Sequence, residues 1–163
     1  MSKIENETFQ LLKEVFTDLG WKPNIYENEM VCKLHCNLSS LSVELNAVIS
    51  ADIAQFFILI DSSINIPNNK KTIASEYLLR VNYELGAITF DMDFDTGDVR
   101  CKAAIDFKNG SISKMLMQNT ILTGLKTADI YFPGLHKVIL GNFDSSGIKE
   151  IIRNQEQTIH NKK

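Results

Sequence analysis

The stretch that decides the fold is ELGAITFDMDFDTGDVRCKAAIDF, residues 84–107, which alternates apolar and polar side chains on both sides of a turn. The apolar positions recur at every second residue: Ile88, Phe90, Met92 and Phe94, then Val99, Cys101, Ala103, Ile105 and Phe107. This period is typical of strands with one face on a core. Gly97 supplies the positive φ that a tight turn needs. The stretch therefore predicts a β-hairpin, with strands near 87–94 and 98–107.

The charges of the hairpin predict its register. Placing Phe94 opposite Val99 sets acidic residues of the first strand against basic residues of the second: Asp93 against Arg100, and Asp91 against Lys102. Opposite charges facing each other across strands are mildly stabilising. In this register Phe90 and Phe94 both belong to the core.

Four aspartates of the hairpin, Asp91, Asp93, Asp95 and Asp98, invite a calcium or magnesium interpretation. A solvated strand face and a turn explain them better, because no bidentate Glu follows to close a calcium loop. Cys32, His35 and Cys36 resemble zinc ligands, but on a strand the histidine points away from the two cysteines. We therefore expect no metal and no cofactor.

The rest of the chain completes an α+β fold. The other expected elements are a helix at 5–20, strands at 29–37, 41–50 and 53–61, a helix at 70–85, a helix capped by Ser111, a short helix at 135–140 after an interruption at Phe132-Pro133-Gly134, and a last helix around Ile148, Ile151 and Ile152. The order helix, three strands, helix, two strands, helices predicts a five-stranded antiparallel sheet packed by helices. We expect one domain over 1–163, with a polar tail from about 154.

Composition excludes several classes of function. The chain has 163 residues, 44% of them hydrophobic, and a net charge of −3, with a pI near 5.6. This charge disfavours nucleic acid and anionic membranes as partners. The longest apolar run, 56–60, is too short to span a bilayer, and the first residues do not have the pattern of a signal peptide. Together with three cysteines, an odd number, this predicts a cytoplasmic protein.

The sequence contains no recognisable catalytic motif. A glycine-rich phosphate loop, a GxSxG elbow and an HExxH pair are all absent, and the histidines stand at positions 35, 136 and 160, far from one another. We therefore expect a protein that is not an enzyme, although an enzyme whose site has no motif remains an alternative.

Two runs resemble the YbjN family, including its cyanobacterial-type members: LLRVNYELGAITFDMDFDTGDVRCKAAIDF at 78–107 and MQNTILTGLKTADIYFPGLHKVILG at 117–141. The specific features are Asn82, the turn at 95–98, and Asp129 with the YFPGL segment. The similarity covers about 5–150. It departs after Gly141, where a turn containing proline is expected and NFDSSGIKE stands instead. The resemblance implies a fold like that of type III secretion chaperones, without a catalytic site, that binds segments of other proteins.

These observations lead to a non-enzymatic protein- or peptide-binding module, chaperone-like or regulatory. The alternative is an adaptor dedicated to one folded partner. The strand IAQFFILID, 53–61, is apolar on both faces, so the set that the helices leave over forms a patch. We expect Val48, Phe57 and Leu59 to form part of a surface for a partner or for a homodimer. The equal alternative is that the C-terminal helices cover both faces of the sheet.

Overall fold

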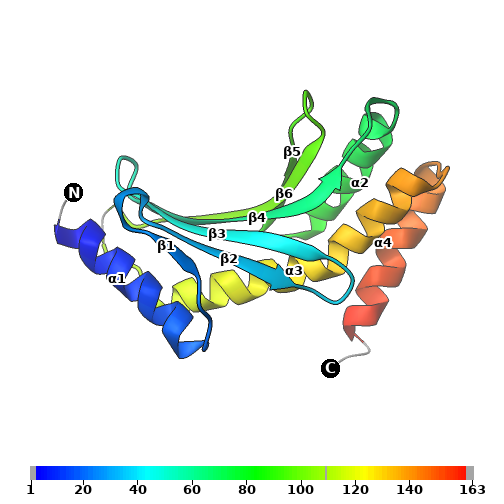
Figure 1. The fold of residues 1–163 in the computed structure, drawn as a ribbon. Helices are drawn as coiled ribbons and strands as arrows, with labels where there is room; N and C mark the ends of the chain where they lie inside the picture. Colours follow the sequence, from blue (N-terminus) through cyan, green and yellow to red (C-terminus); the bar gives the residue numbers. More distant parts are fainter. Residues whose placement is uncertain (1–2, 109, 161–163) are drawn as a thin grey trace.

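The computed structural model describes residues 3–108 and 110–160. Within them the chain forms an open antiparallel sheet and four α-helices (Figure 1). The helices are α1 Lys3–Asp18, α2 Lys71–Glu84, α3 Lys114–Leu140 and α4 Ser145–His160. The strands are β1 Asn24–Tyr26, β2 Val31–Asn37, β3 Ser42–Ser50, β4 Gln55–Asn65, β5 Thr89–Met92 and β6 Asp98–Asp106, and two short 3-10 helices are Glu27–Glu29 and Asn68–Lys70. The fold class is therefore α+β, as the sequence predicts.

The strands lie in the order β1-β2-β3-β4-β6-β5, and each neighbouring pair is antiparallel. The described residues thus form six strands where the sequence predicts five. The additional strand, β1, has three residues, all exposed, and pairs Asn24–Tyr26 with 31–33 of β2. It was missed because three residues are too few to display an alternation.

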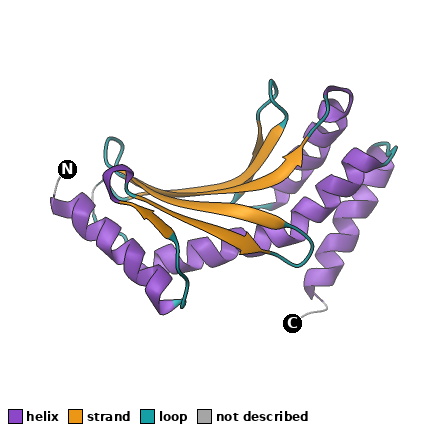
Figure 2. Cartoon of the chain, viewed as in Figure 1, coloured by secondary structure: helices purple, strands orange, loops and turns teal. Residues whose placement is uncertain are grey.

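All four helices pack on the same side of the sheet (Figure 2). The side chains beneath them alternate with exposed ones, so that Val43, Leu45, Ala47 and Ile49 of β3 are buried. Phe56, Ile58 and Ile60 of β4 are also fully buried. The sequence left open the alternative that C-terminal helices cover both faces, and this alternative is wrong: α3 contacts β4 and β6 from one side, and α4 packs on α2 and α3.

The hairpin forms, but its register differs by two residues from the predicted one. Met92 pairs with Val99 and Asp91 pairs with Arg100. The side chain of Asp93 accepts hydrogen bonds from the backbone N–H groups of Asp95 (2.8 Å) and Thr96 (3.1 Å), so the chain leaves the strand earlier than expected. A shift of two keeps every side chain on its face, and the apolar pattern cannot detect it.

The prediction that Phe94 belongs to the core is therefore wrong, because this residue lies in the loop and is 60% exposed. Phe90 is buried, as predicted, and packs edge-to-face against Tyr131 and Phe132. Gly97 has the predicted positive φ, +84°, and a side chain there would strike the backbone of Ile66.

The predicted break at Phe132-Pro133-Gly134 is also wrong, because α3 runs through it to Leu140. A proline inside a helix costs roughly 3 kcal/mol. Burial of Phe132, Leu135 and Val138 on the same turns outweighs this cost. The predicted short helix at 135–140 is thus the end of α3.

Two further boundaries differ from the sequence prediction. The side chain of Ser113, rather than Ser111, caps α3 by accepting a hydrogen bond from the N–H of Leu116 (3.2 Å). The segment from 154, predicted as a polar tail, continues α4 to His160. Gln155 in that segment bonds the carbonyl of Ile130 and the hydroxyl of Tyr77, which anchors α4 to α2 and α3.

Two residues that carry the family resemblance make contacts that hold elements together. The side-chain amide of Asn82 donates to the carbonyl of Phe90 (2.9 Å) and accepts from its N–H (2.8 Å), so α2 is tied to the edge strand β5. The carboxylate of Asp129 accepts hydrogen bonds from the N–H and hydroxyl of Ser39, which fixes the β2–β3 turn on α3. Both residues are therefore explained by the fold.

Candidate partner-binding surface

The face of the sheet opposite the helices carries a line of apolar side chains that crosses five strands. Residues paired directly across antiparallel strands share a face, so the register gives its members. We call the apolar row the set Tyr26, Val31, Val48, Phe57 and Ala104, which are consecutive partners on β1, β2, β3, β4 and β6. In the described part of the chain, no helix lies over it (Figure 1).

The members of the apolar row are accessible to solvent. Tyr26 is 44% exposed, Ala104 is exposed, and Val31, Val48 and Phe57 are half-buried. By contrast, the residues that alternate with Phe57 on β4, Phe56 and Ile58, have no exposed surface. A contiguous apolar patch on the surface of a folded protein commonly marks an interaction site.

The structure brings together the three residues singled out in the sequence. Val48 and Phe57 are direct partners across β3 and β4, and half-buried Leu59 lies two residues further along β4 on the same face. Sequence reasoning missed Tyr26, because β1 was not predicted, and Ala104, because a small residue among charged ones gives no apolar signal. Val31 had a signal, as an apolar residue on the polar side of its strand.

On one side, the apolar row is bordered by a row of residues that are polar except for Leu59. We call the border row the next set of cross-strand partners: Lys33, Asn46, Leu59 and Lys102, on β2, β3, β4 and β6. It carries two ammonium groups and no carboxylate. The opposite border of the apolar row consists of Ser50, Gln55 and Asp106.

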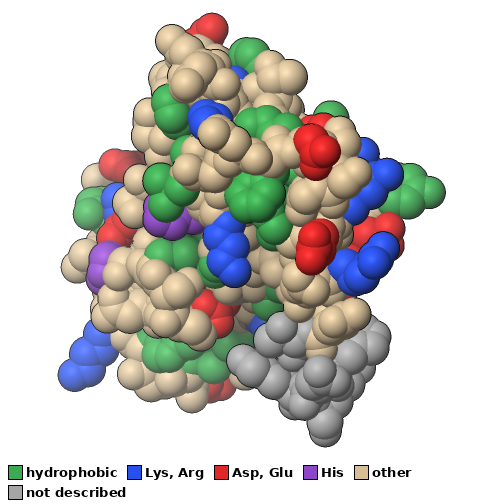
Figure 3. Space-filling model, turned by 90° about the vertical axis from the view of Figure 1, so that its right-hand side faces the viewer, with side chains coloured by type: hydrophobic (Ala, Val, Ile, Leu, Met, Phe, Trp, Pro, Cys, Tyr) green, Lys and Arg blue, Asp and Glu red, His purple; other side chains and the backbone are tan. Residues whose placement is uncertain are grey.

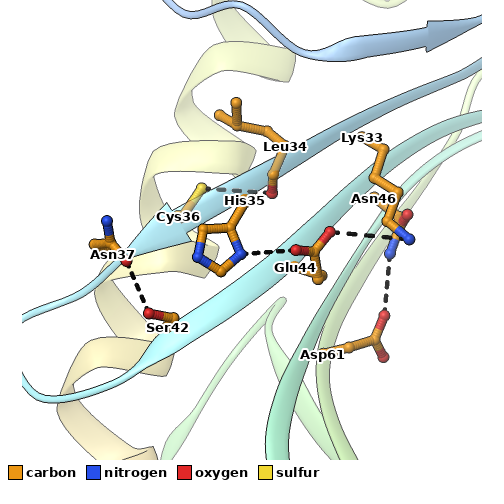
Figure 4. Close-up of polar contacts among 9 residues, drawn as sticks. All are labelled: Lys33, Leu34, His35, Cys36, Asn37, Ser42, Glu44, Asn46 and Asp61. Atoms are coloured by element: carbon orange, nitrogen blue, oxygen red, sulfur yellow. Dashed lines mark hydrogen bonds and ion pairs between the residues drawn. The ribbon is translucent and has the colours of Figure 1, made fainter.

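A network of polar contacts joins the border row to the next row of residues on the same face (Figure 4). The carboxylate of Glu44 lies 2.7 Å from His35 Nδ1 through Oε1 and 3.8 Å from Lys33 Nζ through Oε2. The Asn46 amide donates to Asp61 at 3.0 Å. These groups are paired with one another, so the network explains the polar part of the face without a ligand.

His35 and the two nearby cysteines do not converge. Cys32 points into the core, where burial raises the pKa of its thiol to about 12, whereas His35 lies on the opposite face. Cys36 is half-buried, and burial also raises the pKa of its thiol. In residues 3–108 and 110–160, no group of three or more His, Cys, Asp or Glu side chains is arranged to hold a metal ion.

Three of the hairpin aspartates, Asp91, Asp93 and Asp98, have side-chain partners within the protein. Asp91 lies 2.6 Å from Lys102 Nζ and 3.7 Å from Arg100, and Asp93 holds the turn. Hydrogen bonds from Thr96 and Asn65 lower the pKa of Asp98. A cavity of about 750 Å³ lies between this hairpin and α2, lined by four of the chain's aspartates, Asn82, Arg100 and apolar side chains including Leu79.

A second exposed apolar pair lies on α2. Leu79 is 69% exposed and Tyr83 is 87% exposed, next to Arg80 and Glu76, which pair with each other at 2.7 Å. The pair is small and interrupted by charge. On the side of the molecule drawn in Figure 3, apolar side chains are likewise scattered among charged and neutral ones.

None of the described helices is long and apolar enough to cross a membrane. The three cysteines are free thiols.

No protein-family model matches the chain, and no curated protein matches its sequence. Solved structures with a similar fold exist. YbjN from E. coli, described there as a candidate transcription regulator, has a TM-score of 0.56 at 11% identity, over 78% of this chain and 89% of that one. The ExsC–ExsE complex gives a TM-score of 0.51 at 16% identity, over 80% and 94% of the two chains.

The Yersinia pestis type III secretion chaperone SycH was solved with a stable fragment of a second protein, YscM2. It has a TM-score of 0.49 at 15% identity, over 76% of this chain and 98% of that one. At these identities the likeness concerns the fold. The likeness to YbjN agrees with the family that the sequence resembles, with six strands in the described residues rather than the predicted five.

Proposed function

We propose that this chain is a non-enzymatic, cytoplasmic, YbjN-like module, a single domain that binds another protein or a peptide segment through the uncovered face of its sheet. The binding residues are Val48, Phe57 and Leu59, extended by Tyr26 and Ala104. The observation that carries the proposal is the apolar row, because a contiguous apolar patch that no helix covers commonly marks an interaction site.

The fold likeness supports this proposal. A chain with a fold similar to this one was solved as part of a complex of two proteins, ExsC and ExsE. Interaction surfaces combine an apolar centre with a polar rim, and here the apolar row has polar residues on both sides. The role is chaperone-like if the partner is a peptide segment, and that of an adaptor if the partner is one folded protein.

An enzyme whose active site has no recognisable sequence motif is the weaker alternative. A catalytic carboxylate or histidine is usually desolvated inside a cleft. The aspartates of the 750 Å³ cavity instead make ion pairs and turn contacts, of which Asp91–Lys102 and Asp93 with Thr96 are examples. These contacts favour a structural role.

The proposal is tested by crosslinking pull-down from the native cell, followed by mass spectrometry. The variant Phe57→Ser with Leu59→Ser is compared with the wild type and with Leu79→Ser plus Tyr83→Ser, which removes the exposed pair on α2. We expect the β4 variant to lose the captured protein and the α2 variant to keep it.

Thermal unfolding of each variant completes the test. Because Phe57 and Leu59 are half-buried, each substitution is expected to cost about 1–2 kcal/mol, and the double variant is expected to stay folded. A β4 variant that unfolds would show that both residues belong to the core, and the assignment of this surface would be wrong. Equal capture by the folded β4 variant would have the same meaning.

A further inference from the structure

The apolar residues of the uncovered face are continuous across the strands and discontinuous along them. On this face β3 presents Glu44, Asn46, Val48 and Ser50, and β4 presents Gln55, Phe57, Leu59 and Asp61. A peptide lying along a strand would therefore meet at most two apolar side chains in succession. An occupant that uses the whole apolar row must cross the strands.

The spacing of the apolar row matches a helix better than an extended chain. Neighbouring strands lie about 4.8 Å apart, so the row is about 19 Å long from Tyr26 to Ala104. Four turns of an α-helix rise about 22 Å. In an extended chain every second side chain lies on one face, and four such two-residue repeats span about 27 Å. Its side chains would therefore be spaced too widely to match the strands of the row.

Backbone hydrogen bonding gives the same preference. The N–H and C=O groups of β3 and β4 are used between strands, since both have a partner on each side. An extended segment crossing them would bury its own backbone groups without partners, whereas a helix satisfies these groups internally. β4 also curves away from α3 toward its end, so that the uncovered face is concave along this strand and forms a shallow trough that runs across the strands (Figure 1).

The bend has a local cause. The register of β4 with β6 shifts between Asp61 and Asn65, where four steps along β4 oppose two steps along β6. Extra residues in one strand bend it and increase its twist. The bulge therefore lifts this end of the sheet beside the apolar row.

Charge sets the direction in which the occupant crosses the strands. Lys33 and Lys102 lie on the border row, three strand spacings apart, or about 14 Å. Asp106 lies on the other border. Lys33 and Lys102 contact Glu44 and Asp91, but an ammonium has three donors and each side chain remains 42% exposed. Carboxylates of a bound helix can share both cations if they stand eleven residues, about 16 Å, apart on one side.

We infer that the apolar row accepts an amphipathic helix of a partner protein, lying across the strands, with acidic residues toward Lys33 and Lys102 and basic residues toward Asp106. The inference rests on the proposed function and specifies the chemistry of the partner. It differs from a second copy of this chain and from an extended peptide, and both alternatives are outcomes of the test.

The test measures binding of labelled 18-residue probe peptides to the full chain by fluorescence anisotropy. The first peptide is a designed helix with leucines at i, i+4, i+7 and i+11, glutamates on one flank and lysines on the other. The second has the same composition rearranged into alternation of period two. The third replaces the glutamates of the first with lysines, so that neither direction of docking brings carboxylates to Lys33 and Lys102. Sedimentation velocity of the chain alone is measured in parallel.

We expect the helical peptide to bind at least tenfold more tightly than the alternating peptide. The peptide with lysines on both flanks should bind several-fold more weakly, and Lys33→Glu with Lys102→Glu should reverse that order. Phe57→Ser with Leu59→Ser should weaken the helical peptide at least tenfold. Leu79→Ser with Tyr83→Ser should leave its affinity within twofold.

Different failures have different meanings. If the alternating peptide binds as tightly as the helical one, or if neither binds, the helical occupant is wrong, and the proposed function stands as long as the pull-down still depends on Phe57 and Leu59. If the helical peptide binds equally to the wild type and to the Phe57→Ser, Leu59→Ser variant, this face is not the binding surface. A wild-type dimer dissociated by that variant would place a second copy on the face and overturn the inference.

Discussion

The two faces of β4 are similar in composition and differ in their surroundings. Phe56, Ile58 and Ile60 point toward α3 and have no exposed surface, whereas Phe57 and Leu59 point away from it and remain half-buried. The five residues 56–60 thus supply both the centre of the core and the centre of the apolar row. Hydrophobicity alone did not decide which residues became core: the side on which the helices packed did.

The comparison is tested most strongly by the adjacent phenylalanines. Phe56→Ala should reduce the free energy of unfolding by about 3–5 kcal/mol, because it empties a fully buried site. Phe57→Ala should cost less, about 2 kcal/mol, because part of its side chain is already in water. Urea denaturation of the two variants measures the difference, and equal losses would mean that both faces are covered.

Close packing on the helix side gives a second prediction. A methyl group at Gly124 of α3 would collide with the side chains of Ile58 and Ile60, so Gly124→Ala should cost about 1–3 kcal/mol. Gly86 has open space around it, and Gly86→Ala serves as the matched control with a change within about 0.5 kcal/mol. A neutral Gly124→Ala would show that α3 packs less closely on β4 than described.

The charged residues of the hairpin should have the smallest effect. Asp91→Asn combined with Asp93→Asn is expected to cost about 1 kcal/mol or less, because the ion pairs are exposed and an asparagine oxygen can still accept the turn hydrogen bonds. Urea denaturation measures this loss. Calorimetric titration of the wild type with calcium chloride checks the metal interpretation, and binding that disappears in the double variant would establish it.

The sequence predicted the features that depend on local periodicity, and it missed those that depend on partners. Four strands followed from alternation and β4 followed from its apolar run, and the order of these elements predicted the fold class. The register of the hairpin did not, because a shift of two residues preserves alternation and the turn contacts of Asp93 decided it. The helix through Pro133 was missed because the burial of Phe132 and Leu135 is a tertiary effect.

The candidate surface was accessible to sequence reasoning in part. The two-sided strand at 53–61 identified Phe57 and Leu59 as one of two alternative sets, and Val48 as their neighbour. Choosing between the sets required knowing where α3 packs. The row itself depends on cross-strand pairing, which brings Tyr26 and Ala104 into line with residues more than twenty positions away.

Photo-crosslinking in the native cell tests the central claim most directly. A photoreactive residue is placed at Ala104, an exposed member of the apolar row, or at Thr72, an exposed position on α2. The account predicts an adduct at Ala104, several-fold more abundant than at Thr72, that disappears when Phe57→Ser and Leu59→Ser are added. An adduct at Thr72 alone, or an adduct at Ala104 that survives those substitutions, would contradict it.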